Sequence, residues 1–129
     1  MKLRAHHIYC VPFLKMNLSE RGQDFVQVEN KIRQTMCKES GEPVEVVWGV
    51  DELCQVCPLC RGNRCHSPNG DEEEVRKLDS IILKELGVSV GTALTVNEWR
   101  KIIKQKSPPD FCNRCRVRSF CCVGSDEAV

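Results

Sequence analysis

Apolar side chains recur three or four residues apart in two long segments of the chain. In residues 20–38 they are Phe25, Val28, Ile32 and Met36. In residues 71–86 they are Val75, Leu78, Ile82 and Leu86. Because this spacing places side chains on one face of a helix, the pattern predicts two amphipathic helices whose apolar faces contribute to the core.

The second of these helices has clear start and stop signals. Asp71 is a favourable N-cap residue, and Gly87 directly follows the last apolar position. The acidic run of residues 71–74 is expected in the first turn, where carboxylates interact favourably with the helix dipole. We therefore expect this helix to begin after Asp71 and to end at about Leu86.

A third helix is predicted further along the chain. Thr95 and Glu98 have the spacing of a capping box, in which each side chain bonds the backbone N–H of the other residue. The apolar face of this helix consists of Trp99, Ile102 and Ile103. The Ser-Pro-Pro sequence at residues 107–109 is expected to end it.

Strand signals are sparse. Residues 44–48 are rich in β-branched side chains and form the one good strand candidate. Because one strand cannot form a sheet, either residues 3–8 pair with it or the fold is essentially helical. We predict a mainly α fold, with a small α+β fold as the alternative. In either case residues 1–129 form a single domain, in which two cysteine-rich loops surround the helical pair of residues 71–86 and 95–106.

Length and charge narrow the class of protein. A chain of 129 residues with a formal net charge of +1 is typical of one globular domain without strong attraction to nucleic acid or to a membrane surface. The apolar stretch from Ile8 to Leu14 contains Pro12 and is too short to span a membrane or to form a secretory signal. We therefore expect a cytoplasmic protein, whose thiols are kept reduced.

Cysteine is the unusual feature of the composition, with ten residues. Two of them, Cys10 and Cys37, lie apart from the others. The first cluster consists of Cys54, Cys57, Cys60 and Cys65. The second cluster consists of Cys112, Cys115, Cys121 and Cys122. In a reducing compartment, clustered cysteines bind metal more often than they form disulfides.

The spacing within the first cluster favours a metal or an iron–sulfur cluster over redox thiols or a disulfide. A Cys-x-x-Cys unit places two thiolates on one tight turn, where both can reach a single metal. The run Cys54, Cys57, Cys60 resembles that of bacterial ferredoxins, although the next gap is four residues rather than three. Asp51 is placed to cap a short turn that enters the cluster.

The second cluster is rich in positive charge, because Arg114, Arg116 and Arg118 lie among its cysteines. The simplest interpretation is that these arginines lower the pKa of the thiols and neutralise an anionic site, or lie in solvent. They also offer a docking patch for an acidic redox partner protein. Three arginines and few aromatic residues make a poor nucleic-acid surface.

Taken together, these motifs resemble those of domain-of-unknown-function family 1284, a bacterial and archaeal family described as iron–sulfur binding. The resemblance rests on the N-terminal Met-Lys-Leu-Arg-x-His-His-Ile-x-Cys, on Val50 to Pro58 and on the second cluster. It implies that the cysteine positions of the family are Cys10, Cys54, Cys57, Cys65, Cys112, Cys115 and Cys121. It leaves Cys37, Cys60 and Cys122 as additions of this chain.

Seven family cysteines are one short of two sites with four ligands each. Cys60, His6 or His7 could complete a site, or one site could keep an open position. A histidine pair at such a place is also a common hydrogen-bonded structural feature. The candidate ligands of a cluster or metal are therefore Cys10, Cys54, Cys57, Cys60, Cys65, Cys112, Cys115 and Cys121.

Three functions remain open. The first is an iron–sulfur protein, with a 4Fe-4S cluster, that transfers electrons or senses redox state. The alternative is a structural zinc module that uses the same cysteines as an adaptor. The third is an enzyme, but the only other histidine, His66, follows Cys65 directly, and we identify no catalytic residues.

Overall fold

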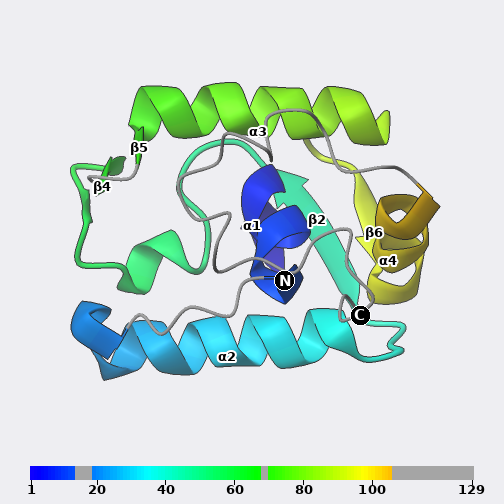
Figure 1. Ribbon diagram of the computed structural model, residues 1–129, viewed down its shortest axis with the longest axis horizontal. Coiled ribbons are helices and arrows are strands. Elements are labelled where there is room, and N and C mark those ends of the chain that lie inside the picture. The colour runs from blue at the N-terminus through cyan, green and yellow to red at the C-terminus, as the bar shows by residue number, and fades with distance from the viewer. Residues whose placement is uncertain (14–18, 68–69, 106–129) are drawn as a thin grey trace.

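The computed structural model describes residues 1–13, 19–67 and 70–105, and these form a small α+β fold (Figure 1). Within these ranges the α-helices are α1 (Ala5–Cys10), α2 (Gln23–Cys37), α3 (Glu72–Leu86) and α4 (Val96–Gln105). Two three-stranded sheets accompany the helices. The α+β alternative is therefore the correct one, because short strands bridge segments that are far apart in the sequence.

The first sheet crosses the middle of the molecule. Its strands are β1 (Lys2–Arg4), β2 (Pro43–Val47) and β6 (Ala93–Thr95), in the order β1-β2-β6. The outer strand β1 runs parallel to β2, and β6 runs antiparallel to it. The expected pairing of the N-terminal segment with residues 44–48 is confirmed for β1, but the chain turns into helix α1 at Ala5.

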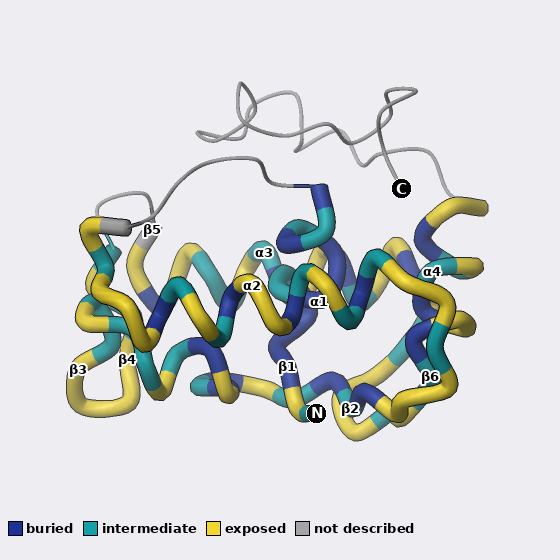
Figure 2. The backbone as a smooth tube through the Cα atoms, turned by 90° about the horizontal axis from the view of Figure 1, so that it is seen from below, coloured by how far each residue is buried: buried dark blue, intermediate teal, exposed yellow. Residues whose placement is uncertain are grey.

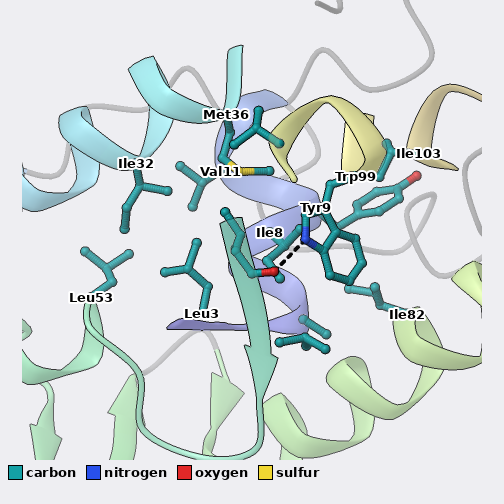
Figure 3. Packing of buried hydrophobic residues seen from close by; sticks show 14 of the residues in the cluster. Leu3, Ile8, Tyr9, Val11, Ile32, Met36, Leu53, Ile82, Trp99 and Ile103 are labelled. Carbon is teal, nitrogen blue, oxygen red and sulfur yellow. Dashed lines mark hydrogen bonds between the residues drawn. The ribbon is translucent and has the colours of Figure 1, made fainter. Parts of the chain in front are cut away.

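The core forms where the sheet meets the apolar faces of the helices (Figures 2 and 3). Leu3 of β1 lies close to Ile32 of α2 and Leu53 in Figure 3, and all three are buried. Trp99 of α4 is buried too, and its indole N–H donates to the carbonyl oxygen of Val44 at 2.9 Å. This bond ties α4 to the central strand.

The predicted ends of the helices are largely confirmed. Asp71 accepts a hydrogen bond from the backbone N–H of Glu74 at 3.1 Å, and Gly87 ends α3 in the left-handed conformation at a φ of 70°. Thr95 and Glu98 form the capping box at the start of α4. Helix α2 begins at Gln23 rather than near residue 20, because residues 19–21 form a separate 3-10 turn.

The expected close pair of helices is replaced by a different arrangement. Helix α3 packs against α1, whereas α4 packs against β6 and α2. Figure 1 shows α3 and α2 on opposite sides of α1, with α4 at one end. The reason is β6, which carries the chain onto the central sheet between α3 and α4 and so separates the two helices.

The second sheet contains part of the first cysteine cluster. Its strands are β3 (Cys60–Arg61), β4 (Arg64–Ser67) and β5 (Gly70–Asp71), and each is antiparallel to the next. The hairpin between β3 and β4 turns at Gly62 and Asn63, whose φ values are 59° and 58°. Chain continuity then places the cysteine hairpin against the start of α3.

The second cysteine cluster lies outside the described residues, as do its three arginines. The predictions for Cys112, Cys115 and Cys121 therefore remain predictions, and so does a docking role for Arg114, Arg116 and Arg118. No helix in the part of the chain that the structure describes is long and apolar enough to cross a membrane.

Candidate metal centre

The first cysteine cluster forms one continuous turn and hairpin. Cys54 opens a 3-10 turn over Cys54–Val56, and its carbonyl oxygen accepts from the N–H of Cys57 at 3.0 Å. The carbonyl oxygen of Cys57 accepts in turn from the N–H of Cys60 at 3.1 Å. Cys60 and Cys65 are cross-strand partners in β3 and β4. The fold thus gathers four predicted ligands on a single local unit.

The thiols of this unit influence one another. The pKa of Cys60 is raised, first by burial and then by the charges of Cys57 and Cys65. Burial raises the pKa of Cys54 to about 12, and the neighbouring Asp51 carboxylate contributes to the same shift. Thiols that resist ionisation when close together become good ligands once a cation compensates their charge.

Asp51 organises the entrance to this unit. It is buried, and its Oδ1 accepts from the backbone N–H groups of Leu53 and Cys54 at 3.0 and 2.9 Å. Its Oδ2 accepts from the N–H of Arg4 at 2.8 Å and from His7 Nδ1 at 2.5 Å. Burial alone would raise the pKa of Asp51, but the charge of His7 and these bonds hold it well below its usual range. The expected capping role of Asp51 is confirmed.

Arg4 is a fully buried cation beside the cysteine unit. Its guanidinium donates to both carboxylate oxygens of Glu72, at 3.2 and 2.8 Å, and to Asp79 Oδ2 at 3.0 Å. Its Nη1 also lies 3.8 Å from the sulfur of Cys54. Burial alone would lower the pKa of Arg4, but the bonds and charges of its partners raise it above its ordinary value. A permanent positive charge therefore lies next to a candidate ligand sulfur.

Glu72 departs from the role expected for the acidic run. Asp71 caps the helix as predicted, but Glu72 is buried and binds Arg4 and Arg76 instead of lying in solvent. It also accepts from the N–H of Cys65 at 3.0 Å. Burial alone would raise the pKa of Glu72, but the bond to Arg4 and then those to Cys65 and Arg76 lower it to about 2. One ion pair thus links α3, β1 and the cysteine hairpin.

The two adjacent histidines of α1 are each bound to a buried aspartate. His6 Nδ1 lies 2.8 Å from Asp79 Oδ1, which also accepts from the backbone N–H of His6 at 2.9 Å. His7 Nδ1 binds Asp51, as described above. The two rings lie with centroids 4.1 Å apart and planes inclined at 52°. The hydrogen-bonded interpretation of the pair is therefore correct, and it leaves metal binding open.

Within the described residues, one group of side chains has the proximity that a metal ion needs. One potential ligand atom from each of His7, Asp51 and Cys54 lies within 4.8 Å of the others. Among the other predicted ligands, Cys57, Cys60 and Cys65 lie on the adjoining turn and hairpin, and Cys10 ends α1. Cys37, predicted as a bystander, lies 3.8 Å from the carbonyl oxygen of Pro12.

Sequence reasoning missed Arg4, Glu72 and Asp79. A signal was present for Asp79, because it lies three residues before Ile82 and so on the apolar face of α3. An acid in that position is expected to have a buried partner. No pattern in the sequence around Arg4 indicated that it is this partner.

Comparison with known proteins gives one match. Residues 22–121 match the sequence profile of a family described as proteins of unknown function, DUF1284. No curated protein and no solved structure matches the chain. The matched range contains the first cysteine cluster and extends to Cys121, whereas Arg4, His6 and His7 precede it. The match confirms the resemblance inferred from the sequence.

Proposed function

The chain belongs to the DUF1284 family, and we propose that it is a metalloprotein whose first cysteine cluster binds an iron–sulfur cluster for electron transfer or redox sensing. A 4Fe-4S cluster is the expected form, with Cys54, Cys57, Cys60 and Cys65 as ligands. Cys10 and the second cysteine cluster would then supply the remaining ligands for a second site.

The observation that carries the proposal is the placement of four cysteines on one continuous turn and hairpin. Thiolate sulfur is the donor type that iron–sulfur clusters require, and the short spacings within the run are typical of cluster-binding loops. The donors therefore fit the group that the family resemblance implies.

Arg4 adds a second supporting argument. Its guanidinium lies 3.8 Å from the sulfur of Cys54 and is held in place by two buried carboxylates. Hydrogen bonds to ligand sulfur and nearby charge are among the factors that set the reduction potential of a cluster. A fixed cation in this position would favour the reduced, more negative state.

A partner for this chemistry belongs to the same proposal. The second cluster contains Arg114, Arg116 and Arg118. A basic rim beside a redox centre steers an acidic partner protein toward it. We propose such a redox partner rather than a nucleic acid or a membrane.

Zinc is the second candidate, and one observation favours it. The group of His7, Asp51 and Cys54 offers nitrogen, oxygen and sulfur donors together. Such mixed sets are typical of zinc, whereas iron–sulfur clusters are held mainly by cysteine. In that case the cysteine unit is a structural zinc module, and the protein serves as an adaptor that binds other molecules.

Anaerobic purification tests the two candidates directly. We expect iron and acid-labile sulfide in comparable amounts, visible absorbance that bleaches on reduction, and an electron paramagnetic resonance signal from the reduced protein. Cys54→Ser and Cys65→Ser should lose most of the iron and sulfide. The matched control Cys37→Ser should retain both. Stoichiometric zinc without sulfide would reject the iron–sulfur proposal in favour of the zinc module.

A further inference from the structure

The histidines of α1 share an arrangement that the iron–sulfur proposal does not use. The Nδ1 atom of His6 faces Asp79, and the Nδ1 atom of His7 faces Asp51. Both aspartates are buried, with 0% and 2% of their surfaces exposed. Each imidazole ring is therefore fixed at its Nδ1 atom by a hydrogen bond to a buried carboxylate.

The hydrogen bonds of the aspartates fix the tautomer of each ring. All four bonds to Asp51 come from N–H donors, two at each oxygen. Asp79 accepts two bonds from His6 at one oxygen and one from Arg4 at the other. Because an ionised carboxylate only accepts, each Nδ1 carries its proton and each neutral ring has its lone pair on Nε2.

The two Nε2 atoms are consequently the available donor atoms of this pair. Neither makes a hydrogen bond to any residue in the ranges that the structure describes. The side chains of His6 and His7 are 18% and 15% exposed, so their outer edges remain reachable from solvent. The pKa of His6 is lowered by burial and by His7, which favours the neutral ring that metals bind.

We propose that His6 and His7 form a metal site of their own, in which their Nε2 atoms bind a borderline divalent cation such as Zn²⁺ and water completes the coordination. The ring centroids lie only 4.1 Å apart, which keeps the two Nε2 atoms near each other. Imidazole nitrogen is a good ligand for zinc and similar cations. A histidine that binds a metal through one ring nitrogen commonly donates the N–H of the other nitrogen to a carboxylate, which fixes the orientation of the ring. Asp51 and Asp79 are then positioning residues rather than ligands.

This site is compatible with an iron–sulfur cluster or a zinc ion held by cysteines alone, because either leaves both Nε2 atoms in place. A zinc ion held by His7, Asp51 and Cys54 would instead engage one of the two rings. Open water positions would allow the histidine-bound cation to polarise a small ligand or to activate water. The proposal therefore adds a site with exchangeable water ligands beside the cysteine sites.

Nuclear magnetic resonance of the histidine rings tests the site without any substitution. Protein labelled with ¹⁵N-histidine is first purified with its cysteine sites filled, and its iron, sulfide and zinc contents are measured. Before metal is added, His6 and His7 should both give the Nδ1–H tautomer. Zn²⁺ should then shift their Nε2 resonances and leave those of His66 unchanged. His66 is the natural internal control, because its Nε2 atom is already hydrogen-bonded to the carbonyl oxygen of Arg61 at 3.2 Å.

Calorimetry with Zn²⁺ supplies the second measurement. The wild-type protein should bind one further equivalent of zinc beyond that already present, and His6→Gln combined with His7→Gln should remove it. His66→Gln should bind as the wild type does. Asp79→Asn should weaken zinc binding about 10- to 100-fold, as expected for a residue that orients a metal-bound histidine.

The opposing outcomes are equally clear. The proposal is wrong if saturating Zn²⁺ leaves the Nε2 resonances of His6 and His7 unmoved, or if the double variant binds zinc as well as the wild type. The metal content measured at the start reports on the cysteine sites separately. Failure of the iron–sulfur proposal and failure of the histidine site are therefore distinguished within one experiment.

Discussion

At the scale of single residues, Arg4 is the most consequential side chain. It is fully buried and would be costly to desolvate alone, but its planar guanidinium binds Glu72 through two nitrogens and Asp79 through a third. Removing one member of such a buried group leaves uncompensated charge in the interior. The same residue contacts the sulfur of Cys54, so stability and the candidate metal centre depend on one side chain.

Replacing Arg4 should therefore lower the free energy of unfolding far more than replacing Arg76, the more exposed arginine that also binds Glu72. Arg4→Met is expected to lower the free energy of unfolding by about 3–5 kcal/mol, because two buried carboxylates lose their cation. Arg76→Ala also removes a bond to Glu72, but that side chain is 41% exposed, and the loss should be about 1 kcal/mol or less. Urea unfolding monitored by circular dichroism measures both. Equal losses would show that burial of the ion pair is not what matters.

At the scale of elements, helix α4 depends on its first turn. The Thr95 hydroxyl accepts from the N–H of Glu98 at 3.2 Å, and Glu98 Oε1 accepts from the N–H and the hydroxyl of Thr95 at 3.1 and 3.0 Å. These bonds to the ionised carboxylate lower the pKa of Glu98. The helix places Trp99 in the core, so this exposed cap helps to position a buried residue.

The lowered pKa gives the cap a defined pH dependence. Because the folded pKa of Glu98 lies below its ordinary value of 4.5, the cap stabilises the fold above that value and fades as the pH falls through the folded pKa. Titration of the Glu98 side-chain carboxyl by carbon nuclear magnetic resonance should give a midpoint below 4.5. Thr95→Val should move the midpoint upward. An unchanged midpoint in that variant would contradict the role of the hydroxyl.

At the scale of the whole molecule, the two sheets have very different support. The strands β1 and β2 contain Leu3, Val44 and Val46, which are almost completely buried. The strands β3 and β4 consist of half-buried or exposed residues and are only two and four residues long. A hairpin this small is marginal in water without a further source of stability. A metal ion bound by its cysteines, as proposed above, would be such a source.

Removing the proposed metal should loosen the cysteine hairpin at one end of the molecule and leave the rest intact. After chelation, hydrogen exchange should accelerate at least about tenfold at residues 60–67, which corresponds to about 1.4 kcal/mol of local stability. The amides of β2 and the middle of α3 should keep their protection from exchange, because these segments are packed in the hydrophobic core and not in the cysteine hairpin. Unchanged protection at residues 60–67 would show that the hairpin is stable without metal.

The sequence predicted what is local and missed what is not. The apolar stripes of α2 and α3, the Asp71 cap and the Thr95–Glu98 box depend on residues a few positions apart, and all are found in the structure. The strand β6 escaped prediction because three residues contain too little pattern to identify.

The candidate site shows the same division. The capping role of Asp51 and the grouping of cysteines followed from spacing. Arg4 and Asp79 are 75 positions apart and meet because β1 lies beside β2 while α1 packs on α3. That encounter depends on topology, which no local pattern specifies.

The contacts of β1 and α1 with later parts of the chain determine when these N-terminal residues can reach their final environment during synthesis. Arg4 and His7 leave the ribosome before any of their partners, which follow 44 to 75 positions later. Until α3 has emerged, the Arg4 guanidinium and the His6 imidazole lack the carboxylates of Glu72 and Asp79 that they bind in the folded protein. The ion pair of Arg4 with Glu72 and Asp79 therefore closes late in biosynthesis, after helix α3 has been made.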